Sequence, residues 1–165
     1  MERQHLLENW LKAQFPGKIF TLQPASADAS FRRYFRIFLD SKTWIVMDAP
    51  PQQEDCKPFL QVANMLAATG VHVPKVWSYD LAQGFLLLSD LGHTTYLQIL
   101  TQDDDQANQL YSDATDALVK IQLSSQAPNL PDYDETLLRR ELNLFPDWYI
   151  AKHLQADLST KQKAM

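Results

Sequence analysis

The stretch that divides this chain is Phe85-Leu86-Leu87-Leu88-Ser89-Asp90-Leu91-Gly92. Its four apolar residues are typical of a buried strand, and the segment that follows and ends in glycine predicts a short connector. Before this stretch, patterns typical of strands and of helices alternate. After it, only helical patterns follow. We therefore expect two lobes joined by a hinge, which we call the connector (residues 89–93).

The part before the connector is predicted to hold a small sheet. Two runs rich in aromatic and β-branched residues flank Asp40-Ser41-Lys42, so they predict a hairpin. An amphipathic pattern that ends at Gly70, where a helix C-cap belongs, predicts a helix among the strands. The expected order is helix, three strands, helix and two strands, at residues 7–15, 19–22, 34–39, 43–47, 55–69, 73–77 and 85–88.

The part after the connector is predicted to be helical. Apolar residues recur at helical spacing in residues 95–100, 103–124 and 134–154, and Pro146 is expected to bend the last of these helices. The predicted fold class is α+β. Its expected parts are an N-terminal helix, a small lobe, the connector and an incomplete helical lobe, at residues 1–18, 19–88, 89–93 and 94–165.

Composition excludes several classes of protein. The 165 residues are 45% hydrophobic and 21% charged, which is typical of a globular protein. A net charge of -5 argues against a nucleic-acid-binding face, because such a face needs clustered Lys and Arg. Cys56 is the only cysteine, so we expect no internal disulfide, no thiolate zinc cluster and a cytoplasmic setting. No apolar run approaches the roughly 18 residues of a membrane span, so we expect a soluble protein without a membrane partner.

The usual phosphate-binding motifs are absent from the sequence. Its four glycines are too far apart for G-x-G-x-x-G or for G-x-x-x-x-G-K-[ST]. A different feature remains, the loop around Ala27 to Arg36, which joins small residues to three arginines. Small residues between two strands let backbone N–H groups approach a phosphate chain, and arginines bind its oxygens in pairs. The alternative is a surface hairpin whose arginines are solvated.

Five spaced strings together resemble the aminoglycoside-phosphotransferase-like family. They are A-S-A-D-A-S-F-R-R-Y-F-R-I, W-I-V-M-D-A-P-P, G-V-H-V-P-K-V, F-L-L-L-S-D-L-G and R-R-E-L-N-L-F-P-D-W-Y, in this order between residues 25 and 149. Within that family they are most similar to the bacterial cell-wall sugar kinases that phosphorylate N-acetylmuramate and N-acetylglucosamine at the anomeric position. The resemblance implies a protein-kinase-like N-terminal lobe and the first helices of a C-terminal lobe.

The resemblance also implies roles for single residues. It implies that the nucleotide ATP lies under the loop between the first two strands and against the connector. The residues it assigns to ATP are Ala29, Ser30, Arg32, Arg33, Met47, Ser89, Asp90 and Leu91. It assigns the sugar substrate to Glu141 and Trp148. Two alternatives stay open, because Glu141 is also compatible with a solvated helix face and Trp148 with a core aromatic.

Two departures from kinases stand out. Kinases pair a strand lysine with a helix glutamate to hold the α- and β-phosphates. The lysine position falls near Met47 and Asp48, and the glutamate position falls near residues 59–61, and neither residue type is present there. We therefore hypothesise that Arg32 or Arg33 supplies the positive charge.

The second departure concerns the catalytic loop. None of the four histidines begins an H-x-D-x-x-x-x-N loop, which in kinases supplies the catalytic Asp and a metal-binding Asn. We therefore expect the catalytic residues and the Mg²⁺ ligands to follow residue 165, and the chain alone to lack activity. Two hypotheses result. The chain is the ATP-binding part of an ATP-dependent amino-sugar kinase, or it is a non-catalytic module that binds a nucleotide, complements a separate C-terminal half or self-associates.

Overall fold

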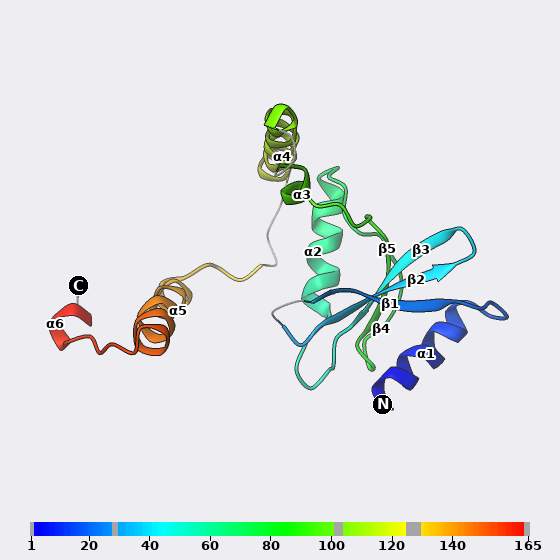
Figure 1. Cartoon of the computed structure of the whole chain (residues 1–165), viewed down its shortest axis with the longest axis horizontal. Coiled ribbons are helices and arrows are strands. Elements are labelled where there is room, and N and C mark those ends of the chain that lie inside the picture. Colours follow the sequence, from blue (N-terminus) through cyan, green and yellow to red (C-terminus); the bar gives the residue numbers. More distant parts are fainter. Residues whose placement is uncertain (1, 28–29, 101–103, 125–129, 164–165) are drawn as a thin grey trace. The chain divides into compact units, whose positions relative to one another are not determined.

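The computed structural model describes residues 2–27, 30–100, 104–124 and 130–163. It divides into two compact units, residues 1–126 and residues 127–165. The first unit contains a five-stranded antiparallel sheet (Figure 1). In spatial order the strands are β1 (Thr21–Ala27), β2 (Arg33–Leu39), β3 (Lys42–Asp48), β5 (Phe85–Ser89) and β4 (Val76–Asp80). The predicted α+β fold class is confirmed.

The predicted hairpin is formed by β2 and β3. Leu39 pairs with Lys42, so the loop consists of two residues and not of the three expected. Asp40 has a φ of 53°, the left-handed conformation that tight hairpin loops require. This loop fixes the register of the two strands, and consecutive residues of β2 point to opposite faces of the sheet, as in any β-strand.

One face of the sheet is covered by helix α1 (Glu2–Gln14) (Figure 1). Leu7 and Leu11 are buried there against strand residues from β2, β3 and β5. The Trp10 ring adds a tilted contact with the Phe85 ring, with 5.7 Å between the ring centres. Burying two leucines and this aromatic pair contributes several kcal/mol, at about 1.5–3 kcal/mol for each large apolar side chain. The N-terminal helix is therefore part of the core.

The opposite face of the sheet carries helix α2 (Lys57–Ala68). Phe59 and Leu60 of α2 pack against Met47, Leu86 and Leu88 of the sheet. Met47 and Leu86 have no exposed surface. The helix covers this face only in part, since side chains near the connector border a pocket there.

The turn between β4 and β5 packs against the backbone at the end of β3. Gly84 has a φ of 71°, and a Cβ atom on it would lie 1.8 Å from the Ala49 carbonyl oxygen. The Ala49 N–H donates to the Gly84 carbonyl at 2.8 Å. A glycine is required here both by the backbone conformation and by this close approach.

The remaining described elements are helical. In the first unit they are α3 (Tyr96–Leu100) and α4 (Asp104–Ser124), and in the second α5 (Glu135–Leu144), η1 (Phe145–His153) and α6 (Thr160–Lys163). The predicted bend near Pro146 corresponds to a π-helix, in which the Leu154 N–H donates to the Tyr149 carbonyl five residues earlier. Pro146, which has no N–H to donate to the preceding turn, lies at the start of this π-helix. No helix in the described residues is long and apolar enough to cross a membrane.

Candidate functional site: a pocket beside the connector

A pocket of about 450 Å³ lies between the sheet and the connector. This volume lies within the usual range for sites that bind small molecules. Its apolar wall includes Ile45, Phe59 and Leu88, and its polar rim includes the connector. We call it the connector pocket. The residues that line it are Ala25, Ser26, Tyr34, Arg36, Ile45, Phe59, Pro74, Leu88, Ser89, Asp90, Leu91, Gly92, His93, Thr94 and Thr95.

The three predicted connector residues, Ser89, Asp90 and Leu91, all line this pocket. Ser89 is bound to the segment before β4, because its N–H donates to the Lys75 carbonyl and its hydroxyl accepts from the Lys75 N–H, both at 2.8 Å. The Leu91 N–H donates to no acceptor in the described part of the chain. That N–H is therefore available to a ligand, as a flat heteroaromatic base would require.

Arg36 lines this pocket, although the sequence analysis placed it in the loop of three arginines without assigning it to ATP. Its guanidinium donates to both carboxylate oxygens of Asp90, at 2.6 Å and 3.1 Å. The hydrogen bond from Arg36 is the main cause that lowers the pKa of Asp90 to about 2. The period of two in β2 places Tyr34 and Arg36 on the same face, and this was the signal available in the sequence.

Arg32 also belongs to the α2 side of the sheet. Its Nε donates to a Glu54 carboxylate oxygen at 3.1 Å, and the Phe31 N–H donates to the other oxygen at 3.2 Å. Arg32 borders a second pocket of about 360 Å³, which shares Phe59 and Pro74 with the connector pocket. Although burial opposes it, the Glu54 carboxylate helps to raise the pKa of Arg32. The guanidinium therefore stays charged next to the connector pocket.

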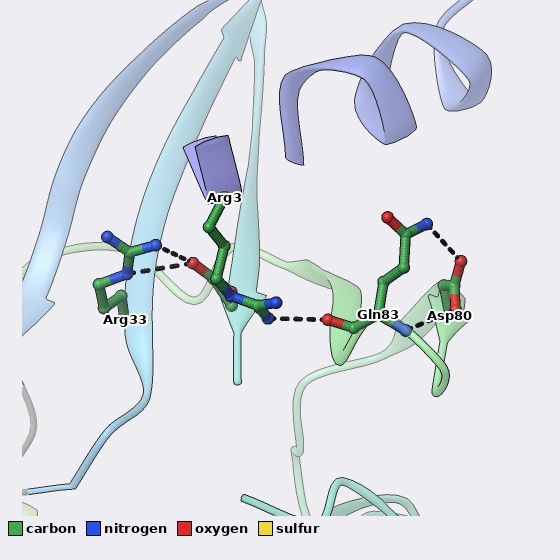
Figure 2. A network of polar contacts seen from close by, with 5 residues as sticks. Arg3, Arg33, Asp80 and Gln83 are labelled. Carbon is green, nitrogen blue, oxygen red and sulfur yellow. Dashed lines mark hydrogen bonds and ion pairs between the residues drawn. The ribbon is translucent and has the colours of Figure 1, made fainter. Parts of the chain in front are cut away.

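Arg33 points to the other side of the sheet. It forms an ion pair with Asp48, which has no exposed surface. Arg3 of α1 binds the second oxygen of the same carboxylate, with Nε at 2.7 Å, and also donates to the Gln83 carbonyl at 2.7 Å (Figure 2). Gln83 is in turn held by Asp80. The network joins α1, β2, β3 and the turn before β5.

The other residues predicted to bind ATP have mixed positions. Ser30 accepts from the Arg32 N–H through its hydroxyl at 3.1 Å, so it shapes the loop before β2. Met47 is completely buried behind the pocket wall and does not line the connector pocket. Ala29 lies outside the described residues. Assignment of these three residues to ATP stays a prediction.

Glu141 and Trp148 belong to the second unit. Glu141 lies 3.5 Å from the Arg140 guanidinium, and the Trp148 side chain is 65% exposed, so it is not a core aromatic in this unit. A pocket of about 510 Å³ in the same unit is lined by neither of them. Their assignment to a sugar substrate stays a prediction as well.

The described residues contain no group of three His, Cys, Asp or Glu side chains placed to hold a metal ion. Asp48 and Asp90, two buried or nearly buried carboxylates, are each paired with arginine. These two carboxylates are therefore not free to bind a cation that accompanies a nucleotide. The expectation that Mg²⁺ ligands lie outside this chain stays a prediction.

Comparison with known proteins places these features in a family context. Residues 21–165 match the phosphotransferase enzyme family. A protein of Pseudomonas aeruginosa named N-acetylmuramate/N-acetylglucosamine kinase is 56% identical over 137 residues, or 83% of this chain and 40% of that protein. Proteins with the same name from Pseudomonas putida and Neisseria meningitidis are 49% and 40% identical, over 87% and 100% of this chain.

The match covers only part of each relative. It extends over 42% of the Pseudomonas putida protein and 50% of the Neisseria meningitidis protein. The chain therefore spans half or less of the length of these relatives. The family match over residues 21–165 includes the sheet, the connector and the residues of the connector pocket.

Proposed function

Because this chain belongs to the phosphotransferase enzyme family, we propose that its sheet and connector form the ATP-binding part of an ATP-dependent amino-sugar kinase. The observation that carries the proposal is the connector pocket, which combines an apolar slot with an available backbone donor. Such a slot suits a flat base. We propose a cytoplasmic setting with it, since ATP is the donor.

The adenine base is proposed to lie against Ile45 and Leu88, which are cross-strand partners on the pocket side of the sheet, with its edge at the connector. The Leu91 N–H has no acceptor in the described chain, and Leu91 itself is 51% exposed. A ring nitrogen of adenine is an acceptor that fits this donor. Ser89 is less suited to bind the base through its N–H, because the Lys75 carbonyl already accepts from it.

The phosphates are proposed to lie next to Arg32 rather than Arg33. Both arginines follow the loop after β1, but only Arg32 lies on the side of the connector pocket. Glu54, in the segment before α2, holds the Arg32 guanidinium at 3.1 Å. The pair Arg32–Glu54 would then do what the strand lysine and helix glutamate do in other kinases, which is to hold one cation toward the phosphates.

The acceptor is proposed to be an amino sugar. This part of the proposal depends on the names of the relatives, which are kinases of N-acetylmuramate and N-acetylglucosamine. Glu141 and Trp148 remain our candidates for contacts with the sugar. Because the chain contains no H-x-D-x-x-x-x-N sequence, we propose that it binds ATP without transferring phosphate.

A second candidate function is a module that binds a separate C-terminal half or another copy of itself. The helices after the connector favour it, because many of their large apolar side chains are exposed. Tyr111 and Leu118 of α4 are 65% and 52% exposed, and Leu142 of α5 is 65% exposed. Under this proposal the helical surfaces are an interface, and the nucleotide pocket is retained.

The proposed function is tested by calorimetric titration of the 165-residue chain with ATP, ADP, adenosine and GTP. We expect ADP to bind at least about tenfold more tightly than adenosine, because charged hydrogen bonds to phosphate add to those of the base. Ala25→Phe fills the connector pocket and should abolish binding. Thr21→Phe, at an exposed position of the same strand, is the matched control.

Absence of ADP binding by a folded chain would contradict the proposal. Phosphate transfer to N-acetylmuramate above a blank without protein would contradict the part that concerns inactivity. Sedimentation of the chain at several concentrations tests the self-association part of the second candidate function, which predicts dimers or larger species.

A further inference from the structure

The Arg36 side chain bridges two parts of the sheet that are not neighbours. Arg36 lies on β2 and pairs in register with Ile45 of β3. Asp90 directly follows Ser89, the last residue of β5, and β5 is on the other side of β3. Two strand spacings are about 10 Å, a distance that only a long side chain spans. The arginine therefore crosses the face of β3 on the pocket side.

At the connector this arginine holds the residues on both sides of Leu91. Its Nε and Nη2 donate to the two oxygens of Asp90, and Nη2 also donates to the Gly92 carbonyl at 2.9 Å. The Gly92 N–H donates back to Asp90 at 2.9 Å. The side chains of Arg36 and Asp90 are only 19% and 6% exposed. A bidentate pair of this kind has one geometry, so it fixes the backbone around Leu91.

We propose that Arg36 is a positioning residue that fixes the Leu91 N–H toward the connector pocket and thereby selects adenine over guanine. The inference rests on the proposed function, because it assigns a base to this pocket. Adenine presents a ring nitrogen that accepts at the edge where guanine presents an N–H donor. A fixed backbone N–H donates to the first and is repelled by the second, whereas a mobile connector can turn a carbonyl toward the guanine N–H.

A purely structural role for the ion pair gives different expectations. If Arg36 only stabilised the fold, its loss would lower the melting temperature and leave the base preference of the folded protein unchanged. If it positions the connector, its loss changes the preference between bases, while binding of inorganic tripolyphosphate, which has no base, stays the same. Exchange of the Gly92 amide hydrogen reports on the connector without any nucleotide.

The test compares Arg36→Met and Arg36→Lys in the 165-residue chain with the control Arg3→Met. The control is closely matched, because Arg3 also donates to a buried aspartate, Asp48, and to a backbone carbonyl, that of Gln83. It lies on the α1 face, away from the connector pocket. Each protein is titrated with ADP, GDP and tripolyphosphate, and amide exchange at Gly92 is measured by mass spectrometry.

We expect Arg36→Met to lower the ratio of ADP to GDP affinity by about tenfold, the effect of losing a charged hydrogen bond. Gly92 should exchange about tenfold faster, because the connector opens locally. Arg36→Lys should recover part of both effects, and Arg3→Met should show neither. If Arg36→Met does not fold, Arg36→Lys alone should still show both changes in a smaller size.

Three results overturn the inference, and they are distinguishable. Wild-type protein that binds ADP, together with an unchanged ADP-to-GDP ratio in Arg36→Met and Arg36→Lys, overturns the positioning role alone. Wild-type protein that is folded and binds no ADP overturns the proposed nucleotide site and the role of Arg36 with it. Unchanged Gly92 exchange in both variants overturns the positioning role whatever the nucleotide data show.

Discussion

The two faces of the sheet both hold arginine–carboxylate pairs, but the pair on the α2 face lies at the rim of the connector pocket, whereas the carboxylate on the α1 face is enclosed. On the α1 face, Asp48 has no exposed surface and is shared by Arg3 and Arg33. On the α2 face, Arg36 binds Asp90 at the rim of the connector pocket. A carboxylate enclosed by two guanidiniums has no room for a ligand. The face on which a side chain lies therefore decides whether its charge stabilises the fold or serves a site.

Arg32 and Arg33 make this comparison within two consecutive residues. They have the same chemistry and the same distance from the loop after β1, yet Arg32 pairs with Glu54 on the pocket side and Arg33 with buried Asp48. Arg33 is the first residue of β2 and Arg32 directly precedes it, so the two consecutive side chains point to opposite sides of the sheet. The sequence left open which of the two would meet a phosphate. The structure favours Arg32, which remains a proposal until a nucleotide is measured.

The largest effect that we expect comes from removing both arginines that bind Asp48 on the α1 face. The double variant Arg3→Met and Arg33→Met leaves the Asp48 carboxylate buried without a partner. It should lose about 3–5 kcal/mol of unfolding free energy, the usual cost of an uncompensated buried charge. Urea denaturation at pH 7, followed by fluorescence of the tryptophans, measures this loss.

The matched control adds Asp48→Asn to the same double variant. This change removes the charge while keeping the shape of the side chain, so it should restore a substantial part of the lost stability. Nucleotide affinity of the folded fraction should be unchanged in both proteins. A triple variant no more stable than the double variant would contradict the view that charge balance holds this face together.

On the pocket face, the stability that the Arg36–Asp90 pair contributes should depend on pH. The pKa of Asp90 in the folded protein is about 2, below its ordinary value of 3.8, chiefly because of the hydrogen bond from Arg36. A carboxyl group whose pKa is lower in the folded than in the unfolded protein stabilises the fold at pH values above its unfolded pKa. This stabilisation is lost as the pH falls toward the folded pKa. Between about pH 4 and pH 2, protonation of Asp90 should therefore lower the unfolding free energy by about 2 kcal/mol.

Asp90→Asn provides the control for that pH dependence. The asparagine cannot titrate, so its unfolding free energy should fall less steeply between pH 4 and pH 2 than that of the wild type. Urea denaturation at pH 5, pH 3.5 and pH 2.5 gives the two slopes. Identical slopes would show that Asp90 gains no stability from Arg36 in the folded protein.

Much of the sheet was predictable because its signals are local. Neighbouring residues alone indicate three of its features: the apolar strand before Ser89, the hairpin around Asp40 and the turn before β5 with its glycine. The expected strands are therefore confirmed, with shifts of a few residues at β1 and β4, while the division of the chain at the connector stays a prediction. The first strand is longer than predicted, because a bulge between Pro24 and Ser26 lets it continue to Ala27.

The polar site was less predictable, because its members are distant in sequence. Arg36 and Asp90 are separated by 54 residues, and only the strand order β2-β3-β5 brings them together. Glu54 likewise meets Arg32 across 22 residues. The spacing of apolar and polar residues along the chain does not indicate contacts between residues so distant in sequence. The absence of a strand lysine was evident in the sequence, whereas the carboxylate that holds Arg32 was not.

A third prediction separates the two consecutive arginines directly. Arg32→Ala should weaken ADP binding by about tenfold while leaving adenosine binding unchanged, because a charged contact to phosphate is lost. Arg33→Ala should leave both affinities unchanged and cost about 1 kcal/mol of stability, since Arg3 still binds Asp48. Calorimetric titration of both variants measures the affinities. Weaker ADP binding in Arg33→Ala alone would reverse the assignment, and unchanged ADP binding in both would remove the arginines from the phosphate site.

The smallest expected effect concerns an arginine–glutamate pair of the second unit. Arg139 on α5 lies 2.6 Å from Glu135, one helical turn earlier, and both side chains are more than two-thirds exposed. Water and salt screen such a pair, so Arg139→Ala should change stability by no more than about 0.5 kcal/mol. Thermal melting by circular dichroism in low and high salt measures the difference. A loss above about 1 kcal/mol would mean that burial is not what distinguishes the arginine pairs of the sheet from this one, since exposed pairs rarely reach that value.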